Sequence, residues 1–333
     1  MKAFLIDRYG GPDRMRAAEA PDPEVGENDV LLQIHAAGVN PIDFKTRNGE
    51  FKLILPDRFP LILGSEAAGI VARVGSRVRR FKPGDEVYAR PRKGRTGTFA
   101  EFIAIAEDDV AHKPKALTME EAASIPLVGL TAWQALVERA NLKRGQKVLI
   151  HAGSGGVGTF AIQLAKHLGA FVATTASTAS FDLVKRLGAD TAIDYKRDDF
   201  ETLLEDYDVV LNSLDGATLD KSLRVLKPGG ILISISGPPD PDFAKEIGAS
   251  RILSLAMRLL SFRIRRKSKR RHVRYSFLLM RASGDQLREI SSVIDGGAVR
   301  PCVDRVFPFE STNEAVAYVE TGRAKGKVVV KVR

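Results

Sequence analysis

Apolar and polar positions alternate in two different ways along the chain, and the change comes near residue 118. Before it, short segments at residues 1–6, 30–36, 69–75 and 98–105 have the period of two that is typical of β-strands, and turn residues such as those at 82–85 separate them. No long stretch of helical period interrupts this region. The pattern predicts a compact β-rich domain through about residue 125.

From residue 118 onward, strands alternate with helices. Thr118 and Glu121 fit a capping box that opens a helix. Strand-like runs follow at residues 147–150, 171–175, 191–193, 208–212 and 230–236, with segments of helical period between them. This is the pattern of a doubly wound parallel sheet with helices on both faces. The closing strand, residues 327–332, is expected to return to the first domain.

The segment at residues 151–158, H-A-G-S-G-G-V-G, lies between a predicted strand and a predicted helix and is called the glycine loop below. Gly153, Gly155 and Gly158 fit G-x-G-x-x-G, in which the glycines allow a tight turn, close approach to a pyrophosphate and close packing of helix on strand. The helix N-terminus then faces the phosphates. A merely flexible glycine loop is the alternative, but the flanking strand and helix favour a dinucleotide site.

The end of the next strand indicates which dinucleotide binds. NAD sites usually place Asp or Glu about 20 residues beyond the glycine loop, on the ribose 2′-hydroxyl. Here residues 174–178 read T-T-A-S-T, and Asp182 is the first acid that follows. NADP is therefore favoured over NAD. The alternative for Ser177 and Thr178 is that they only cap the helix that starts near Ser180.

Composition is that of an ordinary soluble globular protein, with 333 residues, 44% hydrophobic and 28% charged, which is enough for two domains. The single cysteine, Cys302, excludes an internal disulfide and a cysteine-rich zinc site. The histidines are scattered, at His35, His112, His151, His167 and His272, and we interpret them as structural or surface residues. No signal pattern and no apolar run near eighteen residues is present, so the cytoplasm is the expected compartment.

The net charge of +10 comes almost entirely from residues 258–274, which contain nine cations and no acid. Apolar residues recur there at helical spacing, at Leu255, Leu259, Leu260 and Ile264, which predicts a helix over about 252–264. A solvated or subunit-packing helix is the favoured interpretation. Binding of this segment to an anionic membrane surface or to nucleic acid is the alternative.

Several motifs together carry a family resemblance. They are A-A-G-V-N-P-I-D from Ala36, L-G-S-E-A-A-G-I-V from Leu63, K-P-G-D-E-V from Lys82, E-A-A-S-I-P-L-V-G-L-T-A-W from Glu121, L-K-P-G-G from Leu226 and G-R-A-K-G-K-V-V-V from Gly322. Over essentially its whole length the chain resembles the zinc-free quinone oxidoreductase branch of the medium-chain dehydrogenases/reductases, the group that includes zeta-crystallin. The resemblance implies a GroES-like catalytic domain at residues 1–127, a Rossmann NADP-binding domain at 128–283, and a segment at 284–333 that completes the catalytic domain.

The same resemblance implies the site residues. Asn40 and Asp43 are the expected catalytic residues beside the nicotinamide, and Asn40 and Ser65 stand where zinc-dependent relatives carry Cys and His, so no zinc is expected. Ala179 replaces a lysine that often contacts the 2′-phosphate, and Lys185 or Lys196 could take its place. The expected cofactor contacts are Thr131, Gly153, Ser154, Gly155, Gly156, Val157, Gly158, Ser177, Tyr195, Leu214, Ser236 and Gly237.

The resulting functional hypothesis is an NADPH-dependent, zinc-independent oxidoreductase that transfers hydride to quinones or to the carbon-carbon double bond of α,β-unsaturated carbonyls. Asn40 can donate a hydrogen bond to the substrate oxygen, whereas Asp43 could equally be an orienting residue or a turn former after Pro41. By resemblance the protein forms a homodimer through the strand at 273–280. The alternative is a noncatalytic NADPH-binding protein whose basic segment engages RNA or an anionic membrane.

Overall fold

The computed structural model describes residues 1–52 and 56–333 and divides into two compact units. The first unit comprises residues 1–130 and 281–333, and the second comprises residues 131–280. The domain boundaries expected from the sequence, after residues 127 and 283, each lie three residues from these divisions.

The first unit is built on the long strand β3 (Asp29–Val39), which pairs with three other strands and lies within a seven-stranded sheet. That sheet contains β15 (Val303–Pro308), β16 (Lys327–Lys331), β3, β5 (Glu66–Val74), β6 (Glu86–Ala89) and β8 (Val110–His112) in this order, and β7 (Phe102–Ala106) pairs with β3 off this path. A smaller sheet has the order β2 (Arg16–Glu19), β1 (Lys2–Ile6), β4 (Leu61–Ile62). The closing strand β16 runs antiparallel to β3, with Val329 opposite Gly38, which confirms its predicted return to the first domain.

Helices in the first unit begin where the sequence provides caps. Helix α1 begins at Pro41 after a capping box formed by Asn40 and Asp43. The predicted capping box of Thr118 and Glu121 is confirmed, because each backbone N–H donates to the other's side chain, over 3.2 Å and 2.9 Å. The helices of this unit are α1 (Pro41–Asn48), α2 (Met119–Ala123), α3 (Pro126–Trp133, which crosses the division between the units), α11 (Gly284–Asp295) and α12 (Thr312–Glu320). Helix α3 continues into a π-helix at Gln134–Arg139.

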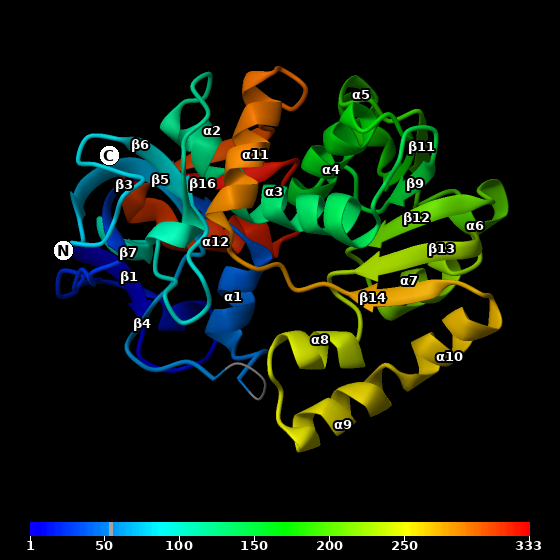
Figure 1. The fold of residues 1–333 in the computed structure, drawn as a ribbon, viewed down its shortest axis with the longest axis horizontal. Coiled ribbons are helices and arrows are strands. Elements are labelled where there is room, and N and C mark those ends of the chain that lie inside the picture. The colour runs from blue at the N-terminus through cyan, green and yellow to red at the C-terminus, as the bar shows by residue number, and fades with distance from the viewer. Residues whose placement is uncertain (53–55) are drawn as a thin grey trace. The chain divides into compact units, whose positions relative to one another are not determined.

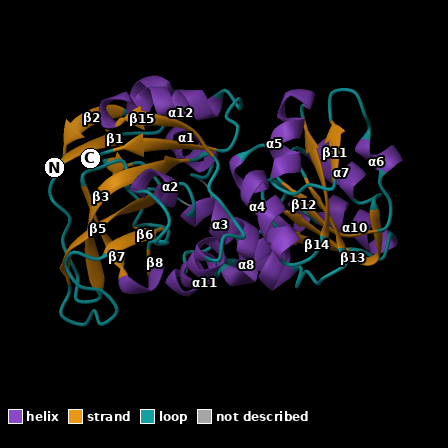
Figure 2. Ribbon diagram, turned by 90° about the horizontal axis from the view of Figure 1, so that it is seen from above, coloured by secondary structure: helices purple, strands orange, loops and turns teal. Residues whose placement is uncertain are grey.

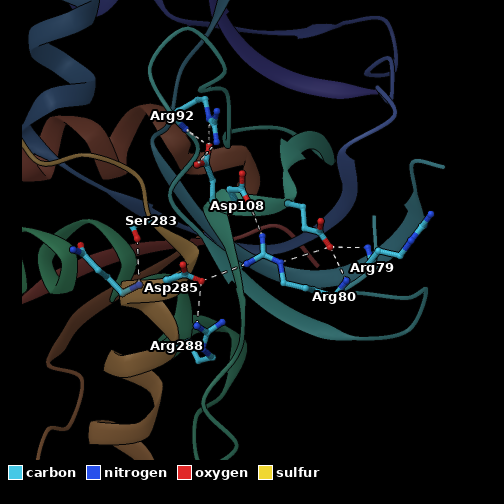
Figure 3. Close-up of polar contacts among 10 residues, drawn as sticks. Arg79, Arg80, Arg92, Asp108, Ser283, Asp285 and Arg288 are labelled. Carbon is cyan, nitrogen blue, oxygen red and sulfur yellow. Dashed lines mark hydrogen bonds and ion pairs between the residues drawn. The ribbon is translucent and has the colours of Figure 1, made fainter. Parts of the chain in front are cut away.

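Side chains fasten the C-terminal segment to the N-terminal part of the first unit. At the surface, the Arg80 guanidinium contacts Asp108 at 2.7 Å and Asp285, in the first turn of α11, at 3.5 Å (Figure 3). In the interior, the Tyr88 hydroxyl donates to the Leu287 carbonyl at 2.6 Å. Exposed ion pairs contribute about 0–1 kcal/mol each. The buried Tyr88 contact therefore contributes more to joining the two segments.

The second unit is a six-stranded sheet in which every neighbouring pair is parallel. The strands, in sheet order, are β11 (Thr191–Asp194), β10 (Phe171–Ala176), β9 (Lys147–Ile150), β12 (Tyr207–Asn212), β13 (Leu226–Ser234) and β14 (Arg274–Phe277). The connecting helices are α4 (Gly156–His167), α5 (Phe181–Arg186), α6 (Phe200–Leu203), α7 (Gly216–Ser222), α8 (Pro241–Glu246), α9 (Arg251–Leu260) and α10 (Phe262–Arg270). Helices α4 and α5 lie on one side of the sheet and α7 and α10 on the other (Figure 2), as predicted for a doubly wound sheet.

The basic segment departs from its prediction. The sequence predicts one helix over about 252–264, but the structure has two helices, α9 and α10, separated at Ser261. Of the four apolar positions that suggested the helix, only Ile264 is buried, whereas Leu255, Leu259 and Leu260 are 57–68% exposed. The buried side chains are instead Met257, Ser261, Ile264 and Ser268. Both serine hydroxyls donate to carbonyls of their own helical segment, which allows these polar residues to lie in the interface.

Candidate functional site

The glycine loop has the conformation that its sequence predicts. Strand β9 ends at Ile150, and α4 begins at Gly156 with Gly155 as its N-cap. A Cβ atom on Gly153 would overlap the Thr174 side chain, and one on Gly158 would overlap the Ala152 carbonyl, both at separations below 3.0 Å. These two glycines are therefore required for close packing of the loop on its neighbours.

Gly155 has a different environment. The nearest atom to a Cβ added there is the Ala152 carbonyl oxygen at 3.3 Å, so the position is otherwise open. The first N–H groups of α4, at Gly156, Val157 and Gly158, have no acceptor within their own helix, and the positive end of the helix dipole lies there. The loop thus offers backbone donors and no side chain at Gly155. This arrangement fits a pyrophosphate.

The remaining predicted cofactor residues of the second unit follow the carboxyl ends of the parallel strands. Ser177 follows β10, Tyr195 follows β11, and Leu214 comes after β12. Ser236 and Gly237 come after β13. Since the carboxyl ends of parallel strands meet at one edge of the sheet, the structure brings these residues to the same edge as the glycine loop. Ligands of open α/β sheets bind at that edge.

Hydrogen bonds fix this edge. The Ser236 hydroxyl donates to the Leu214 carbonyl at 2.6 Å, which joins the segments after β12 and β13. The Gly237 N–H donates to the Ser234 hydroxyl at 2.9 Å, and a Cβ at Gly237 would lie 2.7 Å from the Tyr275 hydroxyl. A larger residue at position 237 would therefore displace the Tyr275 hydroxyl.

A group of polar side chains lies beyond the ends of β10 and β11, which are adjacent strands. Ser177 occupies the N-cap position of a short helical turn without a capping hydrogen bond from its side chain, and Tyr195 is 59% exposed, with the Lys196 ammonium 6.0 Å from its ring centroid. Thr178 donates a hydrogen bond to Asp194, which holds the pKa of that carboxyl below its usual range. Asp194 was not among the predicted residues, although its position directly after the strand predicted at residues 191–193 was a signal.

Thr131 occupies a different kind of position. It lies in α3, where the second unit begins, and is buried. Its contact with the nicotinamide ring stays a prediction.

Asn40 and Asp43 lie in the first unit, at the start of α1, and both are buried. The Asp43 carboxylate accepts hydrogen bonds from the Asn40 backbone N–H at 2.8 Å and from the Ser65 hydroxyl at 2.7 Å. Burial raises the pKa of Asp43 to about 7, against the effect of these two donors. The carboxylate therefore fixes the start of α1. Whether Asp43 also orients groups at the nicotinamide stays a prediction.

The side chain of Asn40 contacts both members of a buried ion pair. The Lys327 ammonium, on β16, lies 2.7 Å from the Glu66 carboxylate, on β5, and also donates to the Val39 carbonyl and to Asn40 Oδ1. The second carboxylate oxygen of Glu66 accepts from the Leu127 N–H at 2.7 Å. Sequence reasoning missed this pair, whose signal was two charged residues within strongly apolar strand segments.

The pair restricts what Asn40 can do. Its amide nitrogen donates to Glu66 at 2.7 Å, and its remaining contact, to the Gly38 carbonyl at 3.5 Å, is weak. The side chain is 1% exposed. The sequence suggested that Asn40 can donate to the substrate oxygen. In the structure one N–H of its amide is committed to Glu66, and the other makes only the weak contact with Gly38.

No group of three or more His, Cys, Asp or Glu side chains that could hold a metal ion occurs within residues 1–52 and 56–333. His151 is buried with its two ring nitrogens beside the Thr175 and Ser222 hydroxyls, and burial lowers its pKa to about 3. The ring is therefore neutral at physiological pH. This environment supports the interpretation of His151 as a structural residue.

The raised pKa of Asp43 predicts a pH dependence of stability. Between about pH 4 and about pH 7 the unfolded carboxyl has lost its proton while the folded one retains it, so the free energy of unfolding falls as the pH rises through this window. Asp43→Asn preserves the shape and has no proton to lose. Urea unfolding across this window is expected to show a smaller decline for the variant, by about 2–4 kcal/mol. Parallel curves for the two proteins would contradict the assignment.

Comparisons with known proteins agree with this geometry. Residues 26–115 match the alcohol dehydrogenase GroES-like domain family, and residues 187–330 match the zinc-binding dehydrogenase family. The chain is 38% identical to the mitochondrial NAD(P)H oxidoreductase RTN4IP1 of Danio rerio, covering 100% of this chain and 91% of that protein. It is 36% identical to the chloroplastic NADPH-dependent alkenal/one oxidoreductase of Arabidopsis thaliana, covering 99% of this chain and 79% of that protein.

Solved structures give the same result for the fold. The quinone oxidoreductase of Coxiella burnetii matches with a TM-score of 0.84 and 33% identity, covering 100% of this chain and 99% of that one. The Escherichia coli quinone oxidoreductase complexed with NADPH matches with a TM-score of 0.82 and 27% identity, over 100% of both chains. The predicted fold class, a GroES-like domain with a Rossmann domain, is thereby confirmed, and so is NADP as the cofactor. The chain belongs to the quinone oxidoreductase group of the medium-chain dehydrogenase/reductase superfamily and is an NADP-dependent oxidoreductase.

Proposed function

We propose that the enzyme reduces quinones, or the carbon-carbon double bond of α,β-unsaturated carbonyls, with hydride from NADPH. The observation that carries the proposal is the NADPH-type edge of the second unit, where the glycine loop offers backbone donors and Ser177 and Tyr195 follow adjacent strands. Relatives named alkenal/one oxidoreductase, 2-methylene-furan-3-one reductase and quinone oxidoreductase support both substrate classes.

The bound nicotinamide would supply the hydride. The protein therefore has to bind the cofactor, orient the substrate and stabilise the charge that develops during transfer. The N–H groups at the start of α4 would hold the pyrophosphate, and Ser177 and Tyr195 would contact the 2′-phosphate. When an enone accepts hydride at its β-carbon, negative charge develops on the carbonyl oxygen and requires a hydrogen-bond donor. We propose the weakly engaged N–H of Asn40 for this role, with Lys327 and Glu66 holding the amide and Asp43 holding the turn.

We also propose that the reaction proceeds without zinc. Asn40 and Ser65 offer an amide and a hydroxyl at the positions where zinc-dependent relatives have Cys and His. The Lys327 ammonium already donates hydrogen bonds to oxygen atoms of Val39, Asn40 and Glu66. A fixed cation therefore balances the Glu66 carboxylate.

One experiment tests these proposals together. The protein is first dialysed against a chelator and then mixed with NADPH and each member of a panel of quinones and enones. We expect some of these substrates to cause NADPH oxidation, which is measured as a loss of NADPH absorbance. For an enone reduced in D2O with ordinary NADPH, deuterium is expected at the α-carbon and not at the β-carbon. NADPH binding without turnover of any substrate would favour the noncatalytic alternative. Activity that disappears with the chelator and returns with Zn²⁺ would contradict the zinc-free mechanism.

The preference for NADPH should depend on Lys196, which we propose as the replacement for the lysine missing at Ala179. Lys196 adjoins the exposed Tyr195, whereas Lys185 lies on α5. We expect NADPH to bind at least about tenfold more tightly than NADH, because one charge-assisted hydrogen bond contributes about 1.5–3 kcal/mol.

Lys196→Met is expected to weaken NADPH binding by about tenfold and to leave NADH binding unchanged, as measured by fluorescence titration. Lys185→Met is the matched control and should bind both cofactors as the parent protein does. A loss of NADPH affinity in Lys185→Met alone would reassign the phosphate contact to that residue.

Oligomeric state and compartment stay predictions. Strand β14 is an edge strand of the parallel sheet, and we propose that a homodimer forms by pairing of this edge with that of a second copy. Relatives whose names place them in mitochondria and chloroplasts leave the expected cytoplasmic location without support.

A further inference from the structure

An exposed apolar stripe follows α9 and ends at the first residue of α10. Ile252, Leu255 and Leu259 of α9 and Phe262 of α10 recur every three or four residues, and they are 56–84% exposed. Met257, on the buried side, is two positions from Leu255, which corresponds to about 200° around a helix. The helix therefore has two apolar stripes on opposite sides, and only one of them packs on the second unit.

The same stripe continues into α10 as a row of cations. Arg263, Arg266 and Arg270 follow Leu259 at spacings of three and four residues, and all three are exposed. Among residues 258–274, Lys267 alone contacts a carboxylate, that of Asp220, in the part of the chain that the structure describes. We call the side chains Ile252, Leu255, Leu259, Phe262, Arg263, Arg266 and Arg270 the α9–α10 face. Figure 1 shows the two helices in sequence along one margin of the second unit.

We propose that the α9–α10 face docks on the surface of an anionic lipid bilayer. A helix that lies in the plane of a membrane interface buries apolar side chains among the acyl chains and directs Lys and Arg to the headgroups. The face has both features, and the positive charge is concentrated here, with nine cations and no acid at residues 258–274. None of the helices in the described residues is long and apolar enough to span a membrane.

Two other partners fit less well. Nucleic acid would use the cations but leaves four large apolar side chains without a partner, because phosphate contacts and base stacking supply its binding energy. A second copy of this chain could cover the apolar stripe, but it brings the same surplus of positive charge to the interface. An anionic bilayer can bury the apolar side chains of the α9–α10 face and also pair with its cations.

Cosedimentation with large unilamellar vesicles tests the proposal with the full chain. Vesicles of equal parts phosphatidylglycerol and phosphatidylcholine are expected to bind the protein at about 0.1 M NaCl, and vesicles of phosphatidylcholine alone at least about tenfold more weakly. Raising the salt to about 1 M should weaken binding to the anionic vesicles, because the Debye length falls from about 10 Å to about 3 Å. Equal binding to both vesicle types, or no binding to either, would overturn the proposal.

A first variant tests the cations. Arg263→Ser, Arg266→Ser and Arg270→Ser combined should weaken binding by on the order of a hundredfold, since each basic residue near an anionic surface contributes about fivefold. The matched control removes three exposed cations located elsewhere, by the substitutions Arg8→Ser, Lys115→Ser and Arg186→Ser. An equal loss in the two triple variants would show that net charge alone is responsible and would contradict a specific face.

A second variant tests the apolar stripe. Leu255→Ser with Leu259→Ser should weaken vesicle binding by at least about tenfold. Leu203→Ser, on α6, is a control, because that leucine is 59% exposed outside the α9–α10 face. Thermal melting checks that both variants are folded. If the double variant binds vesicles normally but changes the oligomeric mass in solution, the stripe belongs to a subunit interface and the proposal fails. Tight, salt-sensitive binding of single-stranded RNA without vesicle binding would also overturn it.

Discussion

Lys327→Ala is expected to lower the free energy of unfolding by about 3–5 kcal/mol, because it leaves the carboxylate of Glu66 buried without a cation. Lys327 is 4% exposed and Glu66 is fully buried, and their charged atoms lie 2.7 Å apart. The substitution also removes the donor to Asn40 Oδ1 and to the Val39 carbonyl. Urea unfolding followed by circular dichroism measures the loss.

Lys331→Ala is the matched control for this prediction. Lys331 lies four residues further along the same strand, is largely exposed and pairs with Glu120 at 3.0 Å. Its removal should cost less than about 1 kcal/mol. Lys327→Met combined with Glu66→Gln is expected to recover part of the loss, because no charge then remains unpaired. Equal stability of Lys327→Ala and Lys331→Ala would show that the buried pair is unimportant.

Gly158→Ala is expected to weaken NADPH binding by about a hundredfold or more. A Cβ there would overlap the Ala152 carbonyl and lie 2.7 Å from Gly153 Cα, and backbone atoms cannot move aside as a flexible side chain can. The loop would have to shift away from the start of α4. Two charge-assisted hydrogen bonds to the pyrophosphate, each worth about 1.5–3 kcal/mol, would then be lost or lengthened.

Gly216→Ala provides the control, since Gly216 also opens a helix of the second unit but has nothing within 4 Å of an added Cβ. Its NADPH affinity, measured by the same titration, should match that of the parent protein. Gly155→Ala should separate binding from folding: the melting temperature is expected to change little, whereas NADPH binding weakens because the methyl group occupies the open side of the loop. Normal NADPH affinity in Gly158→Ala would exclude a role of the glycine loop in binding.

Local patterns were sufficient to predict the parallel sheet and the glycine loop. Strand period, helical period and glycine spacing act over fewer than about 20 residues, and the carboxyl-end edge follows once the strands are parallel. Ser177, Tyr195 and Ser236, which the family resemblance implied as cofactor contacts, come after such strands and therefore lie near this edge.

Contacts between distant segments could not be predicted in the same way. Lys327 and Glu66 are 261 residues apart in sequence, and their pairing depends on the registers of β16 and β5 against β3. Which side of α9 and α10 is buried could not be predicted either. Periodicity shows that Leu255 and Leu259 share a helix face, but which stripe packs inward depends on the surface that the helix meets.

The route of β16 back to β3 has a consequence for the order in which the protein folds during synthesis. The second unit is continuous, at residues 131–280, so it can fold as soon as that stretch has left the ribosome. The first unit is interrupted and lacks its closing strand until residues 327–331 are made. Until then β3 has an open edge, and the Glu66 carboxylate has no counter-ion. The nascent N-terminal sheet is therefore the part of this chain that most needs protection from aggregation, by a chaperone, while translation continues.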